Sequence, residues 1–294
     1  MTVSNCLKNL SDRAIIRDHE KKSIHDSIDT IKHRLDKHFE DDIEDQFIFG
    51  SYTRDTILPR SMDTHSDVDY MVVFNDDGIT PQSYLNRLKK FVENQYWSSE
   101  AHQSHPTIKL DLERITFELV PALKSRSGYK IPNRNHGGDG WIDTDPNDFN
   151  KDLIEKNKEH GSLIKPVIRL MKYWNAQNVY ICDSFELEKW IIKRNFSGLT
   201  LSLKEYFFHC IEELVTEGLI KGYLDVDREK TIIAEVKELE ADGRFAEAED
   251  KIEKLFKSRS LSARLSGLSN KELFNKPTRS LAAVLGLDHE EIWI

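Results

Sequence analysis

Few cysteines and no long apolar run limit what this 294-residue chain can be. The three cysteines lie far apart, at Cys6, Cys182 and Cys210, and none belongs to a CxxC pair. A disulfide framework or a zinc ribbon is therefore not expected. No apolar run approaches the roughly 18 residues that a membrane-spanning helix needs, and the N-terminus lacks the apolar core of a signal peptide. These absences predict a cytoplasmic protein with no membrane partner.

Basic charge is also scarce. The chain has 42 lysine and arginine residues against 51 aspartate and glutamate residues, which gives a net charge of −9. Proteins whose main task is to grip duplex DNA usually carry a basic field. Double-stranded DNA is therefore not an expected partner. Hydrophobic residues make up 38% of the chain, which indicates a globular protein with a well-hydrated surface.

Periodicity divides the chain near residue 145 into two domains. Residues 1–145 mix helical and strand patterns, whereas residues 146–294 are helical by pattern. In the first domain we predict helices and strands at about 19–39, 46–49, 69–74 and 81–96, and a hairpin across 105–123. The Gly-, Asp- and Pro-rich segment 135–150 is predicted to be a loop. In the second domain we predict helices at about 148–159, 162–176, 185–193, 202–217, 228–241 and 245–257.

Two carboxylates stand one residue apart at the start of an apolar run, in the segment SDVDYMVVF. On a strand, residues i and i+2 face the same side, so Asp67 and Asp69 project together while Val68 turns into the core. Like charges this close repel each other, and a hard cation such as Mg²⁺ offsets them. If the pair is considered alone, the alternative to a metal site is that both carboxylates simply lie in solvent at the end of a strand.

A Gly-Ser pair, Gly50 and Ser51, lies shortly before these acids. It follows a predicted strand and precedes a helical turn. Backbone N–H groups in such a turn face an anion, and glycine lets a phosphate approach closely. An ordinary turn explains the pair equally well by itself. Combined with the two carboxylates, the pair predicts a phosphate site beside a metal site.

A third acid is expected from a neighbouring strand. In ITFELVPAL, the carboxylate of Glu118 stands in an otherwise apolar run, where burial is costly unless the charge is paired or bound to metal. Asp111 on the preceding strand is the rival. However, the alternation in KLDLE predicts that Asp111 faces solvent or supports the hairpin. We therefore choose Glu118.

These pieces together resemble a known family. GSYTRDT, SDVDYMVVF and FELVPA, in this order, resemble the DNA polymerase β-like nucleotidyltransferases, and more narrowly the bacterial cGAS/DncV-like nucleotidyltransferases (CD-NTases). LIKPVIRLMKYWN is similar to the family's lysine-bearing helix, and CDSFELEKW to the Ser-aromatic segment that follows it. The resemblance covers roughly residues 24–190. It implies an α+β fold: a nucleotidyltransferase core of mixed sheet and flanking helices, a C-terminal helical lobe, and an active-site cleft between them.

The resemblance also implies a role for each matching residue. Asp67, Asp69 and Glu118 would be catalytic and would hold two Mg²⁺ ions, with Mn²⁺ as the alternative metal. The implied nucleotide-binding residues are Gly50 and Ser51 at the donor triphosphate, Lys172 at its β- and γ-phosphates, Ser184 beside that lysine, and Phe185 at the base. Without the family resemblance, the sequence predicts that Lys172 is a solvated lysine and that Phe185 packs in the core.

The third acid departs from the family pattern, because relatives more often have Asp where this chain has Glu118. The extra methylene moves the carboxylate by about an ångström, and misplacement on that scale costs about a hundredfold in rate. Either the backbone compensates or the site prefers a different metal, such as Mn²⁺. Glu remains a hard oxygen ligand, so we do not interpret the change as inactivation.

The implied reaction is in-line attack by a ribose hydroxyl on the α-phosphate of a nucleoside triphosphate, with pyrophosphate as the leaving group. Two rounds would close a cyclic dinucleotide, a second messenger of CBASS-type anti-phage signalling that activates a separately encoded effector protein. The expected substrates are nucleoside triphosphates: ATP, with UTP, GTP or CTP as candidates beside it.

Other functions remain open at this point. A template-independent enzyme would make linear oligonucleotides or extend RNA ends; it predicts a basic channel, for which the helical half offers only scattered residues such as Lys193, Arg194 and Lys204. Nucleotidyl transfer to a small molecule or a protein fits the Gly-Ser and carboxylate pieces but leaves Lys172 and Ser184 unexplained. A catalytically inactive nucleotide-binding scaffold, from a different class, would bind nucleotide without releasing pyrophosphate.

Overall fold

The computed structural model describes residues 2–76, 78–97, 101–104, 106–133, 140–146, 148–178, 180–217 and 226–257. The chain forms two compact units: Ile15–Lys151, and Met1–Ala14 together with the chain from Asp152 onward. The sequence predicted a boundary near residue 145 and grouped the N-terminal residues with the sheet. In the structure, α1 (Val3–Arg13) instead packs on helices of the second unit. Its apolar face is Val3, Cys6 and Leu7, all of them buried.

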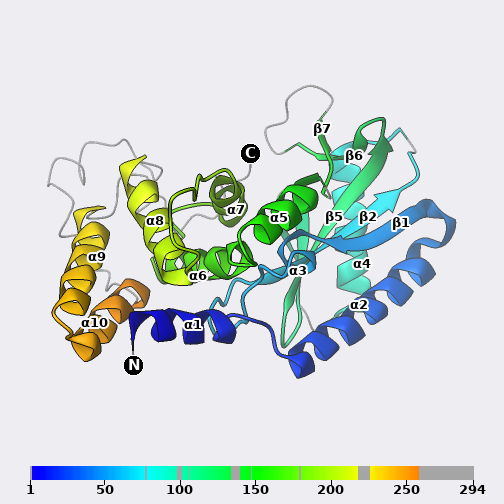
Figure 1. The fold of residues 1–294 in the computed structure, drawn as a ribbon. Helices are drawn as coiled ribbons and strands as arrows, with labels where there is room; N and C mark the ends of the chain where they lie inside the picture. Colours follow the sequence, from blue (N-terminus) through cyan, green and yellow to red (C-terminus); the bar gives the residue numbers. More distant parts are fainter. Residues whose placement is uncertain are drawn as a thin grey trace, which may run out of the picture. The chain divides into compact units, whose positions relative to one another are not determined.

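The Ile15–Lys151 unit is built on a mixed sheet (Figure 1). The main path of the sheet runs β1-β2-β5-β4-β3, and β6 and β7 continue from β5. β2 and β5 pair in parallel, whereas β1 pairs with β2 and β4 pairs with β5 in the antiparallel sense. The strands are β1 (Ile43–Phe49), β2 (Asp67–Phe74), β3 (Ala101–Ser104), β4 (Thr107–Asp111), β5 (Thr116–Ser125), β6 (Gly128–Pro132) and β7 (Trp141–Thr144).

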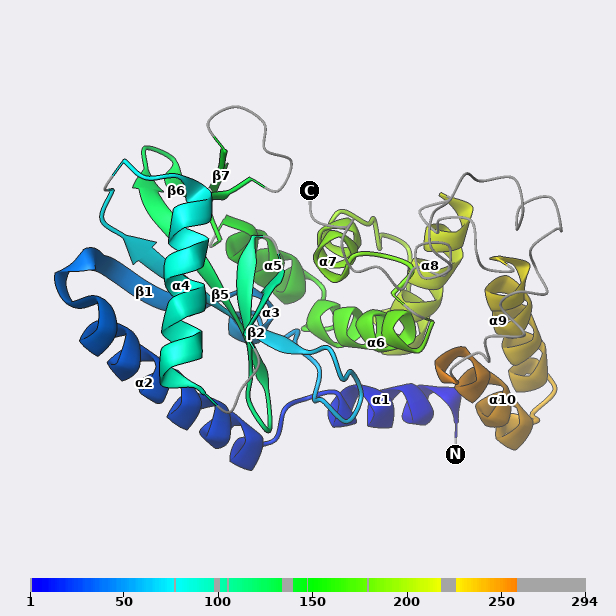
Figure 2. The ribbon, with the colours of Figure 1, turned by 180° about the vertical axis from the view of Figure 1, so that it is seen from behind.

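Two amphipathic helices, α2 (Asp18–Phe39) and α4 (Pro81–Gln95), pack against this sheet (Figure 2). Alternation along β2 sends Val68, Tyr70, Val72 and Phe74 into the core that these helices share with the sheet. Burying a side chain of this size stabilises the fold by about 1.5–3 kcal/mol. The intervening residues of β2, which begin with Asp67 and Asp69, therefore face the opposite side of the sheet.

The short strand β7 was not predicted. The sequence analysis placed Trp141–Thr144 in a loop, but these residues pair with β6, with Pro132 opposite Trp141. Four residues are too few to show an alternating pattern, and the pairing partner that orders them lies elsewhere in the chain. The Trp141 ring also packs against Tyr84 of α4, at a centroid distance of 5.7 Å. Residues 135–139 and 147 of the predicted loop lie outside the described residues.

The second unit is helical, and each helix predicted there is present within a few residues of its expected bounds. After α5 (Asp148–Glu159), which begins in the first unit, come α6 (Ile164–Gln177), α7 (Ser184–Ile192), α8 (Leu203–Thr216), α9 (Val226–Ala241) and α10 (Phe245–Ile252). A 3₁₀ turn (Glu253–Phe256) follows. The Phe256 ring stacks on Tyr173 of α6 at 5.4 Å and on Phe207 of α8 at 5.5 Å. In the described part of the chain, no helix is both long and apolar enough to cross a membrane.

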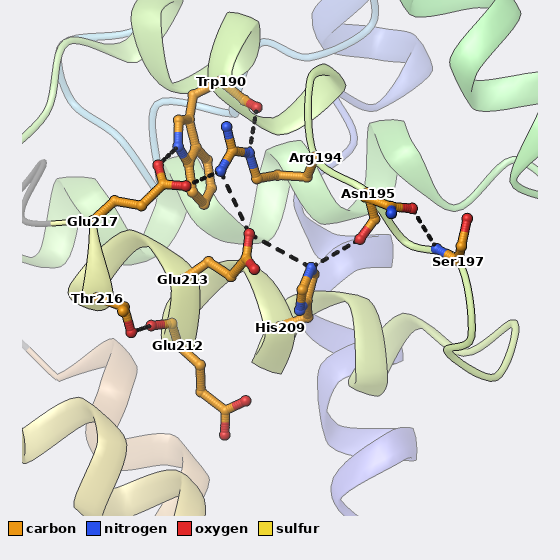
Figure 3. A network of polar contacts seen from close by, with 9 residues as sticks. All are labelled: Trp190, Arg194, Asn195, Ser197, His209, Glu212, Glu213, Thr216 and Glu217. Carbon is orange, nitrogen blue, oxygen red and sulfur yellow. Dashed lines mark hydrogen bonds and ion pairs between the residues drawn. The ribbon is translucent and has the colours of Figure 1, made fainter.

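A polar network joins the end of α7 to α8 (Figure 3). Arg194 forms ion pairs with Glu213, at 3.4 Å, and with Glu217. The indole Nε1 of Trp190 donates to Glu217 Oε2 at 2.7 Å, and the Arg194 guanidinium lies over the Trp190 ring at 4.5 Å. The hydrogen bond from Trp190, followed by the one from Arg194, lowers the pKa of Glu217.

We expect Arg194→Met to lower the thermal unfolding midpoint at neutral pH by a few degrees. Because the pKa of Glu217 is lowered by folding, the stability that this group contributes is present above its unfolded pKa of about 4.3 and is lost as pH falls through the folded value. The difference between Arg194→Met and wild type should therefore shrink in acid. Arg244→Met, which removes an exposed pair between Arg244 and Glu247, is the matched control. An equal loss in both variants would contradict a special role for the network.

Candidate active site

Six polar residues share the sheet face opposite α2 and α4, at one end of β2, β5 and β4. The register places Asp69 beside Glu118 and Asp67 beside Thr116 in the β2–β5 pair. In the β4–β5 pair it places Lys109 beside Glu118 and Asp111 beside Thr116. The result is two rows of three across neighbouring strands, which lie about 4.8 Å apart. We call this set the polar ladder: Asp67, Asp69, Lys109, Asp111, Thr116 and Glu118.

The three predicted acids are thus brought together on one face by strand register. Asp67 and Asp69 are half-buried, and Val68 between them is fully buried, as the alternation predicted. Glu118 is buried at 6% exposure. Parallel pairing of β2 and β5 is the feature that makes Asp69 and Glu118 neighbours, although they are far apart in sequence. Their catalytic role stays a prediction.

Gly50 lies directly against Asp69. It has φ +72°, which favours glycine, and it opens the short helix α3 (Gly50–Thr53) after β1. A Cβ atom added at Gly50 would lie 1.8 Å from Asp69 Oδ2, so no other residue fits while the carboxylate stays there. Next to it, the Ser51 carbonyl accepts hydrogen bonds from the backbone N–H groups of Thr56 and Ile57, at 3.0 and 3.1 Å. The Gly-Ser turn is therefore both fixed in shape and adjacent to the carboxylate pair.

Lys109 is a member of the ladder that the sequence analysis missed. Its Nζ lies 2.9 Å from Glu118 Oε1. Burial acts to lower the pKa of the Lys109 ammonium, but the Glu118 carboxylate, with Asp67 and Asp111 further off, outweighs it and raises that pKa. The alternation in KLDLE shows only that Lys109 and Asp111 share one face of β4, and the register with β5 makes it the face on which Glu118 stands. Asp111 itself is exposed and accepts a hydrogen bond from Thr116 Oγ1, so it supports the pairing of β4 and β5.

Lys172 lies in the helical unit, on α6. It is only 7% exposed, and its Nζ donates to Glu188 Oε1 at 3.1 Å; Glu188 on α7 is 1% exposed. The alternative interpretation of Lys172 as a solvated lysine is therefore wrong. Arg169, one turn before Lys172 on α6, is likewise buried. Helices α1, α7 and α8 all contact α6, so α6 is buried on more than one side.

Ser184 and Phe185 form the first turn of α7. Asp183 caps this helix, because its Oδ1 accepts from the backbone N–H groups of Phe185 and Glu186, both at 2.8 Å. Burial raises the pKa of the Asp183 carboxyl, and these two hydrogen bonds offset part of that effect. The Phe185 ring is half-buried, with the Lys189 ammonium 4.9 Å from its centroid. The ring is thus not part of the core, which was the structural alternative for this residue.

The chemistry of the acids suits a hard divalent cation. Mg²⁺ and Mn²⁺ prefer carboxylate oxygens, and Asp67 and Asp69 offer two on one half-exposed face. Glu118 is engaged by Lys109 instead, and no group of three acidic, His or Cys side chains among the described residues is already gathered for a metal ion. The donor set therefore fits such a cation, provided that Glu118 gives up Lys109.

Comparison with known proteins identifies the family. Residues 1–157, more than half of the 294-residue chain, match the family model of the Second Messenger Oligonucleotide or Dinucleotide Synthetase (SMODS) domain. The chain belongs to this family, which generally uses divalent metal ions. The matched residues contain the whole polar ladder and the Gly-Ser turn.

Two relatives have named activities. The chain is 26% identical to a probable cyclic nucleotide synthase of Bacillus cereus, over 54% of this chain and 60% of that protein. It is 25% identical to a cyclic AMP-AMP-AMP synthase of an Acinetobacter species, over 45% of this chain and 40% of that protein. The chain therefore spans less than two thirds of the length of either relative.

Solved structures of the same kind share the fold. The Vibrio cholerae DncV cyclic AMP-GMP synthase has a TM-score of 0.67 at 12% identity, covering 87% of this chain and 96% of that one. The Elizabethkingia meningoseptica CdnE cyclic dinucleotide synthase has a TM-score of 0.57 at 20% identity, covering 74% and 86%. These likenesses confirm the predicted fold class, a mixed sheet with flanking helices of the CD-NTase type.

Proposed function

We propose that this protein is a nucleotidyltransferase that joins nucleoside triphosphates into a cyclic oligonucleotide and releases pyrophosphate. The observation that carries the proposal is the position of Asp69 within the SMODS match: the β2–β5 register sets it beside Glu118, and Gly50, which follows β1, lies against it. The named relatives support a cyclic product: one forms a cyclic trinucleotide and others cyclic dinucleotides. We take a cyclic dinucleotide as the first expectation, acting as a second messenger of CBASS-type defence on a separate effector.

Asp67, Asp69 and Glu118 would hold two divalent ions, Mg²⁺ or Mn²⁺. When bound, such ions lower the pKa of the attacking ribose hydroxyl and stabilise the negative charge on the leaving pyrophosphate. The strand supplies the positioning, because Val68 is anchored in the core between the two aspartates. The buried side of β2 therefore sets where both carboxylates stand before any substrate binds.

The remaining predicted residues would bind the donor nucleotide. Gly50 and Ser51 would contact its triphosphate through the backbone of a turn that Thr56 and Ile57 hold in shape. Lys172 would supply positive charge to the phosphates, with Glu188 orienting its ammonium. Ser184, predicted beside that lysine, would complete the triphosphate site, and the half-buried ring of Phe185 would stack on the base.

A second candidate is a nucleotide-binding protein without catalysis. The ion pair between Lys109 and Glu118 favours it, because the third acid is held by a cation of the protein itself. This candidate predicts nucleotide binding with no pyrophosphate release. A third, linear oligonucleotide synthesis, shares the chemistry of the first and differs only in its product.

The test is incubation of the purified protein with all four ribonucleoside triphosphates, one labelled at the α-phosphate, with Mg²⁺ and separately with Mn²⁺. The expected result is a labelled product that resists phosphatase, and omission of one nucleotide at a time identifies its bases. A ladder of phosphatase-sensitive products would instead support linear synthesis. Nucleotide binding without product under either metal would overturn the synthase and support the second candidate.

A further inference from the structure

We propose that Lys109 is an internal counter-cation of the acidic site: it holds Glu118 while no divalent ion is bound and competes with that ion for the Glu118 carboxylate. This inference rests on the proposed function, since it takes Asp67, Asp69 and Glu118 as the metal ligands. It assigns Lys109 a positioning role, because the lysine would act through Glu118 and not on the nucleotide.

The first argument is geometric. Lys109 and Glu118 are direct partners across β4 and β5, and Asp69 is the direct partner of Glu118 on the other side, in β2. Glu118 therefore stands between a cation and a carboxylate in one row of the polar ladder. Its Oε1 lies 2.9 Å from Lys109 Nζ, a charge-assisted hydrogen bond. Glu118 thus has a cation of the protein on one side and, on the other, the carboxylate with which it would share a divalent ion.

The second argument is electrostatic. Three carboxylates on adjacent ladder positions repel one another, and the buried Glu118 would be the most costly to leave unpaired. Lys109 is the lysine that the register places in this cluster, and both Asp67 and Asp111 act on it as well as Glu118. It therefore offsets the acidic charge that a divalent ion would otherwise have to offset. A bound ion makes that charge balance redundant and repels the ammonium.

The third argument is the difference in exposure between the two partners. The Lys109 side chain is 35% exposed, whereas the Glu118 side chain is 7% exposed. Lysine carries its charge on a flexible four-carbon stem, so the ammonium can turn toward solvent without any movement of the strands. The carboxylate stays in the site and changes partner. The longer reach of Glu compared with Asp suits a side chain that must serve a partner on each side, which gives the departure at Glu118 a physical reason.

The test is metal binding by Lys109→Met, measured as Mn²⁺ affinity and as the thermal unfolding midpoint with and without Mn²⁺. We expect the variant to bind Mn²⁺ about tenfold more tightly, because a competing positive charge is gone. It should also unfold at a lower temperature in metal-free buffer and gain more from added Mn²⁺ than wild type does. If Lys109→Met does not fold without metal, Lys109→Gln, which keeps a hydrogen-bond donor, serves for the same comparison.

Lys124→Met is the matched control. Lys124 lies on the same strand as Glu118 and pairs with Glu44 at 2.6 Å, but both side chains are exposed. This variant should leave Mn²⁺ affinity unchanged. Equal or weaker Mn²⁺ binding by Lys109→Met would overturn the proposal, provided that Asp69→Asn abolishes binding. If Asp69→Asn binds Mn²⁺ as wild type does, the metal assignment of the proposed function fails, and this inference fails with it.

Discussion

Asp69→Asn is expected to reduce nucleotidyl transfer by at least about a thousandfold, equivalent to about 4 kcal/mol of transition-state stabilisation. The substitution keeps the shape of the side chain and removes the charge that faces the metal site. It should not unfold the protein, because Asp69 stands on the half-buried face of β2 and relief of repulsion from Asp67 and Glu118 offsets any lost contact. The measurement is the rate of pyrophosphate release, with the thermal midpoint recorded in metal-free buffer. We expect that midpoint to be unchanged or raised.

Asp111→Asn provides the control, and it also tests the choice between the two candidates for the third acid. Asp111 belongs to the same ladder face, but it is exposed and its carboxylate is used by Thr116. We expect its substitution to cost less than about tenfold in rate, since it removes a surface charge near the site. A loss as large as that of Asp69→Asn would mean that Asp111, and not Glu118, completes the metal site.

Long periodic elements were predictable, and short or non-local ones were not. Helices α2 and α4 showed their apolar stripes over many turns, and their bounds differ from the prediction by a residue or so. Strand β7 has four residues and is defined by its pairing with β6, which no local pattern reveals. Helix α1 did carry signals that were overlooked: apolar residues at Val3, Cys6 and Leu7, and Thr2, whose side chain accepts from Asn5 N–H.

In the candidate site, too, the features set by a local pattern were predictable and those set by pairing between distant segments were not. Alternation was enough to put Asp67 and Asp69 on one face, because the period of a strand is local. The neighbours of Glu118 depend on the register of two different strand pairs, one parallel and one antiparallel, so Lys109 was identified only from the fold. Lys172 shows the same limit, since the sequence without the family resemblance predicted a solvated lysine, whereas packing in the helical unit buries it.

Gly50→Ala is the second substitution for which we expect a large effect, a loss of about a hundredfold or more in nucleotidyl transfer. Two costs arise at this position. The first is backbone strain, about 1–2 kcal/mol for an L-residue at φ +72°. The second is a collision, because the new methyl group would lie 1.8 Å from Asp69 Oδ2 and 2.7 Å from Asp69 Cγ. The carboxylate must leave its place, so the variant should lose activity even where it folds.

Gly243→Ala separates these two costs. Gly243 has φ +73°, and nothing lies within 4 Å of a Cβ atom added there, so its substitution carries the strain without the collision. We expect Gly243→Ala to lower the free energy of unfolding by about 1–2 kcal/mol and to leave the activity unchanged. Gly50→Ala should lose more stability than this, and adding Asp69→Ala should restore the excess, because the remaining Asp69 Cβ contact of 3.1 Å is tight but tolerable. If Gly50→Ala kept full activity, the contact between the Gly-Ser turn and Asp69 would have no part in catalysis, and the turn would serve only to reverse the chain after β1.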